Sequence, residues 1–174
     1  MIQELDHSKI PNMRNIIQTP EFTDPGFDPG RRYSMPYTWL TLGIGYNKAA
    51  VAAKGVQNPN SWRYLFDSDQ FAGRISLLSE SADLIRLCAK YLGHSVNGIP
   101  DAMLSQIEQM LIRQKPHVKQ FHSDNGQDLL ASGEVDIVME YNGDIAQLMA
   151  SPGGEAFDFV VPQEGTLINS DFLN

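Results

Sequence analysis

Residues 135–144 read Val-Asp-Ile-Val-Met-Glu-Tyr-Asn-Gly-Asp, and this stretch decides the predicted fold. A short, mostly apolar strand over 135–140 is followed by an aromatic residue, a turn and a carboxylate. Such a strand is typical of a parallel sheet that is buried on both faces. The C-terminal ends of parallel strands border a cleft. An aromatic face beside fixed negative charges suits an organic cation, so the stretch predicts a binding protein before it predicts an enzyme.

Strand-like and helix-like segments alternate on both sides of this stretch. The predicted strands are 39–46, 74–78, 118–121, 135–140 and 157–161, and the predicted helices are 81–92, 101–114, 127–132 and 142–150. Ser61 is a predicted N-cap, and Gly93 and Gly133 are predicted to end helices in the left-handed conformation. The alternation predicts the α/β class, a mostly parallel sheet with helices on both faces.

Composition limits the function classes. The chain has 174 residues, 42% hydrophobic and 20% charged, which is typical of a globular protein of one domain or one and a fragment. Its net charge is -8, from 21 acidic residues against 13 Lys and Arg. No basic run is present, so nucleic acid is not an expected partner. An acidic surface attracts cations, but many proteins are this acidic for solubility alone.

The remaining global features are mainly negative. The single cysteine, Cys88, falls at helical spacing among apolar residues, which indicates a buried structural thiol. No apolar run reaches bilayer length. The N-terminus has no signal-peptide pattern, so the protein is expected to be cytosolic or to have lost a leader. Residues 1–34 are rich in Pro and Gly without periodicity, and 166–174 read as an uncapped strand, which suggests a piece of a longer protein.

Carboxylates follow several of the predicted strands. Glu80 and Asp83 come after the strand 74–78, three residues apart at the start of a helix, and this spacing places both on one face. A helix N-terminus favours ionised carboxylates, so the pair could hold a cation. Ordinary acidic capping of the first turn is the simpler alternative.

Four further polar residues occupy comparable places. Tyr141 and Asp144 follow the buried strand, Ser123 follows the strand 118–121, and Asp171 lies in the β-like tail. Asp144 and Ser123 could equally be helix-start residues. Together the strand ends offer Glu, Asp, Ser, Tyr and Asp, and no basic residue is expected among them.

Enzymatic signals are poor, and no catalytic residue, metal or cofactor is expected. Gly43-Ile44-Gly45 lacks the third glycine of a dinucleotide fingerprint, since Lys48 takes its place. The four histidines show no metal-ligand spacing with one another or with Cys88. No nucleophile elbow or P-loop occurs. A hydrolase that uses Glu80 and Asp83 as paired carboxylates stays open as an alternative without a candidate nucleophile–base pair.

The chain resembles the periplasmic solute-binding proteins of ABC importers for spermidine and putrescine. The order and approximate spacing of short motifs fit over essentially the whole chain. The motifs are Tyr33-Ser-Met-Pro-Tyr-Thr-Trp39, Gly43-Ile-Gly-Tyr-Asn47, Ser61-Trp62, residues 79–93, Phe121-His-Ser-Asp124, Gly133-Glu-Val-Asp136, Tyr141-Asn-Gly143 and Pro162-Gln-Glu-Gly165.

The resemblance implies one lobe of a two-lobed type II periplasmic binding protein fold, in which the ligand is clamped between lobes. Residues 1–34 would be an irregular tail of the first lobe, and 35–174 the second α/β lobe. Crossover segments would lie near 35–47 and 161–174, with the body of the lobe over 48–160. Most of the first lobe would then be absent.

The resemblance also implies roles for single residues. Glu80 and Asp83 match acids that bind the amines, Ser123 a serine near the ligand, and Asp171 an acid that grips an ammonium. Tyr141 stands where the family usually has a stacking tryptophan, and Asp144 matches an acid of putrescine-preferring members. Asn169 stands where the family generally has an aromatic, and this difference leaves room for putrescine, another amine or an opine-like solute in place of spermidine.

The function implied is capture of a polyamine, without covalent chemistry, for the membrane subunits of an ABC importer in the periplasm. An alternative of a different class is a non-catalytic interaction module. In that alternative the isolated lobe associates with a second copy through an unpaired crossover strand.

Overall fold

The computed structural model describes residues 2–173. Six strands of this part of the chain form one sheet. The strands lie in the order β3-β2-β4-β1-β5, and β6 pairs with β1. Their bounds are β1 Met35–Asn47, β2 Ile75–Leu78, β3 Val118–His122, β4 Ile137–Tyr141, β5 Phe157–Val160 and β6 Ile168–Leu173.

Some helices precede β1, and the others connect the strands. The α-helices are α1 Pro20–Thr23, α2 Lys48–Ala53, α3 Arg63–Phe66, α4 Ser81–Tyr91, α5 Asp101–Gln114, α6 Gly126–Ala131 and α7 Asn142–Ala150. The 3₁₀ helices are η1 His7–Lys9, η2 Pro11–Asn15, η3 Pro29–Arg31, η4 Lys115–His117 and η5 Gly154–Ala156. None of the helices in the described part of the chain has the length and hydropathy that crossing a bilayer requires.

Two compact units divide the chain. Unit 1 comprises residues 1–40 and 169–174, and unit 2 comprises residues 41–168. Both boundaries fall inside the segments that were expected to be crossovers, 35–47 and 161–174. The assignment of these segments to two lobes stays a prediction.

Strand directions in unit 2 confirm the predicted α/β class. β2 pairs in parallel with both β3 and β4, while β1 is antiparallel to β4 and to β5. Strands β2 to β5 therefore share one direction and β1 opposes them. The register of β1 shows its direction, since Leu42 pairs with Tyr141 and Tyr46 pairs with Ile137. The chain enters unit 2 at the ends where the parallel strands finish.

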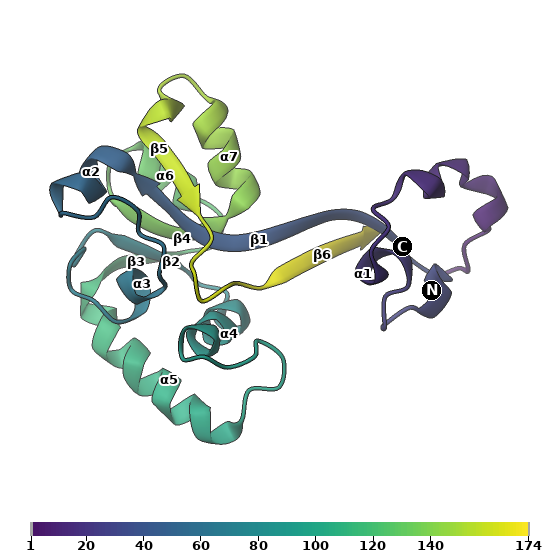
Figure 1. Cartoon of the computed structure of the whole chain (residues 1–174), viewed down its shortest axis with the longest axis horizontal. Helices are drawn as coiled ribbons and strands as arrows, with labels where there is room; N and C mark the ends of the chain where they lie inside the picture. Colours follow the sequence, from purple (N-terminus) through teal and green to yellow (C-terminus); the bar gives the residue numbers. More distant parts are fainter. Residues whose placement is uncertain (1, 174) are drawn as a thin grey trace. The chain divides into compact units, whose positions relative to one another are not determined.

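Helices cover both faces of this sheet, as predicted. Figure 1 shows α4 and α5 on one side of the strands and α6 and α7 on the other. Strand β4 contributes side chains to two hydrophobic cores, one on each face of the sheet. Ile137 and Met139 pack in the larger core with α3, α4 and α5, and Val138 packs in the smaller core with α6 and α7. Cys88 is buried in the larger core, and burial raises the pKa of its thiol to about 12. The prediction of a structural thiol is confirmed.

Element boundaries follow local hydrogen bonding. Helices 101–114 and 142–150 form as predicted, and Gly93 and Gly133 have φ of 84° and 73°. The strand predicted over 135–140 is β4, which begins at Ile137. Asp136, just before it, binds the guanidinium of Arg74 through its side chain at 2.7 Å.

One helix was not predicted, and one predicted N-cap is wrong. Helix α2 was not predicted, and it begins because the Asn47 side chain accepts a hydrogen bond from the Ala50 amide at 3.0 Å. Ser61 is not the N-cap of α3, a position held by Trp62. Its hydroxyl nevertheless accepts a hydrogen bond from the Arg63 amide at 3.2 Å.

Gly43 provides a test of this packing. A Cβ at Gly43 would collide with the ring of Phe159 and lie 2.7 Å from the backbone oxygen of Val160. We expect Gly43→Ala to lower the free energy of unfolding by about 1–3 kcal/mol, because β1 must move away from β5. Urea denaturation measures this. Gly143→Ala is the matched control, since Gly143 has open space around it in α7 and its replacement should be neutral or stabilising.

Candidate functional site

The parallel strands β2, β3 and β4 of unit 2 deliver the predicted polar residues to one edge of the sheet. Glu80 follows β2 and is the N-cap of α4, where its carboxylate accepts a hydrogen bond from the Ala82 amide at 3.3 Å. Asp83 lies in the first turn of the same helix. Tyr141 is the last residue of β4 and immediately precedes α7.

Asp83 is the centre of this group. Its carboxylate is only 5% exposed and accepts a hydrogen bond from the phenol of Tyr141 at 3.4 Å. The guanidinium of Arg86 donates to its other oxygen at 3.3 Å. Arg86, which is not among the predicted site residues, therefore belongs to the same cluster. Arg86 is one helical turn further along α4, and it already balances part of the charge of Asp83.

The negative charges of these carboxylates act on the phenol of Tyr141. The pKa of Tyr141 is raised to about 12 by partial burial and by the negative charges of Asp83, Glu140 and Glu80. A cation placed among the same carboxylates would be stabilised by the charges that disfavour the phenolate.

The raised pKa predicts a pH effect on stability. An unfolded tyrosine ionises near pH 10, so the stabilisation linked to Tyr141 is complete below that pH and is lost as pH rises toward 12. We expect the wild type to lose about 1 kcal/mol relative to Tyr141→Phe between pH 10 and 11. Denaturant unfolding of both proteins at the two pH values measures this, and parallel losses would contradict it.

Ser123 and Asp144 flank the group. The hydroxyl of Ser123 donates to Asp124 at 3.0 Å on the exposed surface after β3. Asp144 is half-buried in the first turn of α7, and its pKa is raised by burial and by the charges of Glu140 and Asp124. Unit 2 thus gathers five of the seven predicted residues near the C-terminal ends of its three parallel strands.

The other two predicted residues belong to unit 1. Asn169 and Asp171 lie on β6, and Asn169 is half-buried while Asp171 is exposed. Asp171 lines a cavity of about 710 Å³ within unit 1, together with Asp28 and Ser34. Burial alone would raise the pKa of Asp28, but hydrogen bonds from the Ser34 hydroxyl and nearby amides lower it. This cavity therefore has an acidic wall.

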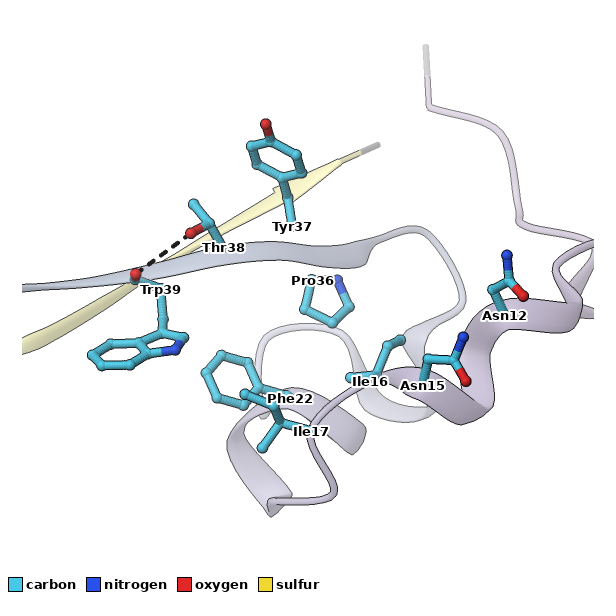
Figure 2. A pocket seen from close by; sticks show the side chains of 9 residues that line it. All are labelled: Asn12, Asn15, Ile16, Ile17, Phe22, Pro36, Tyr37, Thr38 and Trp39. Atoms are coloured by element: carbon cyan, nitrogen blue, oxygen red, sulfur yellow. Dashed lines mark hydrogen bonds between the residues drawn. The ribbon is translucent and has the colours of Figure 1, made fainter. Parts of the chain in front are cut away.

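A smaller cavity of about 280 Å³ is also formed within unit 1 (Figure 2). Phe22, Pro36 and Trp39 gather on one side of β1, while the phenol of Tyr37 points away from them. Its lining is largely apolar and does not include the predicted ligand residues. We assign it no role in cation binding.

The model of one protein family, the bacterial extracellular solute-binding proteins, matches residues 1–174. The chain belongs to this family. Similar curated relatives include the spermidine/putrescine-binding periplasmic protein of Escherichia coli, 32% identical over 173 residues, with 99% of this chain and 47% of that protein covered. The putrescine/cadaverine-binding protein of Pseudomonas aeruginosa is 30% identical, with 97% of this chain and 49% of that protein covered.

Solved structures agree with this assignment. The spermidine/putrescine ABC transporter substrate-binding protein of Streptococcus pneumoniae superposes with a TM-score of 0.82 at 29% identity, over 99% of this chain and 50% of that one. The chain spans about half the length of the curated relatives it matches. The predicted family and the predicted fold class of this chain are both confirmed. Members of such a family are not enzymes, which supports the non-enzymatic prediction.

One buried polar group was not predicted from the sequence of this chain. Glu140, which ends the predicted apolar strand, is fully buried and lies 3.1 Å from the buried imidazole of His122. The available signal was a carboxylate within a run of apolar residues, because an ionised group is buried only with a partner.

Proposed function

We propose that this chain binds organic cations of the polyamine class and serves as part of the substrate-binding component of an ABC importer. The observation that carries the proposal is the buried carboxylate of Asp83, bonded to the phenol of Tyr141 beside the exposed carboxylate of Glu80. The names of the relatives, which are polyamine-binding proteins, support the same ligand class.

In this proposal Glu80 and Asp83 accept hydrogen bonds from a primary ammonium group. Each such bond contributes roughly 1.5–3 kcal/mol in a partly dehydrated site. The ring of Tyr141 contributes about 0.5–2 kcal/mol when the cation lies over its face. Desolvation of the cation offsets much of this, and Arg86 competes for Asp83.

The remaining predicted residues complete the proposal. Ser123 would accept or donate one hydrogen bond, and Asp144 would meet a second ammonium of a short diamine. Asn169 and Asp171 lie in unit 1 and are proposed from the family resemblance alone, Asp171 as an acid that binds an ammonium group. The periplasm and the membrane subunits of an importer follow from the names of the relatives.

A thermal-shift panel tests this function. The ligands are putrescine, cadaverine, spermidine and agmatine, with sodium chloride at matched ionic strength and the uncharged 1,4-butanediol as controls. We expect the diamines to raise the melting temperature more than either control. Equal shifts with sodium chloride would reduce the effect to general charge screening, and a response only to agmatine would favour another class of solute.

The affinity of the 174-residue chain is expected to be low. The chain spans about half of its relatives, and by resemblance the ligand of the full protein is held by two lobes. We expect no binding of putrescine or spermidine tighter than micromolar in isothermal titration calorimetry, since half of the contacts would be missing. Submicromolar binding would contradict this.

Self-association is the second proposed function. Unit 1 exposes large apolar side chains, among them Phe27 at 69%, Tyr37 at 71% and Trp39 at 45%. Tyr37 and Trp39 belong to β1, and exposed apolar side chains on such a strand could contact a second copy of the chain. Size-exclusion chromatography with light scattering tests self-association. A monomer at a concentration on the order of 100 µM, where weak dimers form, would count against it.

A further inference from the structure

A chain of buried polar side chains crosses three strands directly behind the candidate site. The hydroxyl of Ser76 on β2 lies 2.7 Å from Nδ1 of His122 on β3, and Nε2 of His122 lies 3.1 Å from a carboxylate oxygen of Glu140 on β4. All three residues are no more than 3% exposed. The proposed function makes no use of this group.

Hydrogen-bond counting shows that the group accommodates two protonation states. With neutral His122, the Ser76 hydroxyl donates to Nδ1, and Nε2–H donates to Glu140. With protonated His122, Nδ1–H donates to Ser76, whose own proton then reaches the Gln120 carbonyl at 3.1 Å. Every donor has an acceptor in both states and no heavy atom moves. Histidine ordinarily changes charge between pH 5 and 8.

Glu140 connects this group to the candidate site. Its second carboxylate oxygen accepts a hydrogen bond from the Tyr141 amide at 2.9 Å, which fixes the backbone that carries the phenol. The charge of Glu140 also contributes to the raised pKa values of Tyr141 and Asp144. The buried carboxylate therefore acts on two of the residues proposed to meet the amine.

The neighbouring elements close the group from solvent. A Cβ at Gly126, the first residue of α6, would collide with Glu140 and would lie 2.5 Å from Nε2 of His122, so the backbone of α6 packs directly on the pair. On β1, the residue opposite Glu140 is Gly43. The charge of Glu140 acts on two titratable groups, Tyr141 and Asp144 of α7. The charge of Asp124, which follows β3, also acts on Asp144.

We infer that His122 and Glu140 are positioning residues that form a proton-binding pair and set the charge behind the amine site. With His122 protonated, the pair is neutral overall. When His122 loses its proton, the pair carries one buried negative charge beside Tyr141 and Asp144. A cationic ligand then binds more tightly, so affinity rises with pH across the titration of His122. This consequence for the ligand rests on the proposed function.

The first experiment needs no ligand. The titration of the His122 imidazole, the Tyr141 amide and the Asp144 carboxyl is followed by NMR between pH 5 and 9, a range that brackets the ordinary histidine titration. We expect a common midpoint in the wild type, loss of that component in His122→Gln, and its retention in His94→Gln, which alters an exposed histidine. Unrelated midpoints, or an unchanged component in His122→Gln, would overturn the inference.

Ser76→Ala provides a variant that keeps both members of the pair. In this variant, protonated His122 has a buried Nδ1–H without an acceptor, and neutral His122 has only an unused Nδ1 lone pair. The unpaired N–H costs more free energy than the unused lone pair. We expect the pH-dependent change at the Tyr141 amide to move to lower pH in this variant, because the protonated imidazole loses its acceptor. An unchanged or raised midpoint would contradict the proposed proton positions.

The second experiment measures putrescine binding at pH 6 and pH 8 by NMR titration. We expect a gain in affinity of roughly threefold to tenfold at the higher pH for the wild type, since one buried negative charge is added behind the site, and a smaller gain for His122→Gln. Equal gains in both proteins would refute the charge-setting role. A common midpoint without putrescine binding would refute the proposed function and leave the proton-binding pair in place.

Discussion

Asp83→Asn is expected to weaken putrescine binding by roughly 10- to 150-fold, the factor that corresponds to one hydrogen bond to a charged group. Asparagine keeps the shape of Asp83 and can still accept from Tyr141, but it removes the buried charge that would attract an ammonium. An NMR titration of the variant measures this. A change of less than threefold would remove Asp83 from the site.

Two control variants sharpen this test. Asp69→Asn removes an exposed carboxylate in the loop before β2, and it should leave affinity within about twofold, because a distant exposed charge is screened. Arg86→Gln removes the guanidinium that binds Asp83. It should strengthen putrescine binding by up to about fivefold, the value of a partly exposed ion pair. Weaker binding in Arg86→Gln would mean that Arg86 supports the site rather than competing with the ligand.

Trp62→Ala is expected to lower the free energy of unfolding by about 3–5 kcal/mol, the loss typical of a fully buried aromatic side chain. Trp62 is 0% exposed and stacks on Phe66 with ring centroids 5.5 Å apart. Its indole N–H donates to the Gly165 carbonyl at 2.8 Å, so it also fixes the segment that precedes β6. Urea unfolding followed by circular dichroism measures the change.

Two variants separate packing from hydrogen bonding at this position. Trp62→Phe retains an aromatic ring but leaves the Gly165 carbonyl without its donor, and we expect a loss of about 1–3 kcal/mol. Trp39→Ala, at a 45% exposed position in unit 1, should change stability by less than about 1 kcal/mol. Similar losses for Trp62→Ala and Trp39→Ala would contradict the placement of the core.

The sequence permitted prediction of the elements whose signals are local. Helix 101–114 has an amphipathic pattern, Gly93 and Gly133 mark helix ends, and the apolar strand before Tyr141 is typical of a buried strand. The antiparallel direction of β1 was not predictable from its residues, because direction depends on where the chain enters the sheet. Helix α2 was missed because its short Ala-rich pattern shows no apolar periodicity.

The site was predictable only in part for a related reason. The positions of Glu80, Asp83 and Tyr141 at strand ends follow from the topology of parallel strands. Arg86 and Asp83 stand at i, i+3 spacing on one helix, so their pairing was open to prediction from the sequence and was missed. The bond between His122 and Glu140 depends instead on side-chain packing between two separate strands. A carboxylate in an apolar run indicates that a partner exists, but it does not indicate which residue that partner is.

The most direct test of the amine site is a ¹H–¹⁵N NMR titration of the chain with putrescine and, in parallel, with 1,4-butanediol, which has the same carbon chain without charge. We expect putrescine to shift the amides of residues 79–83 and 141–144 in a saturable, millimolar-range manner, and butanediol to leave them unchanged. Shifts of equal size with both compounds, or putrescine shifts spread over the acidic surface instead of these segments, would contradict it.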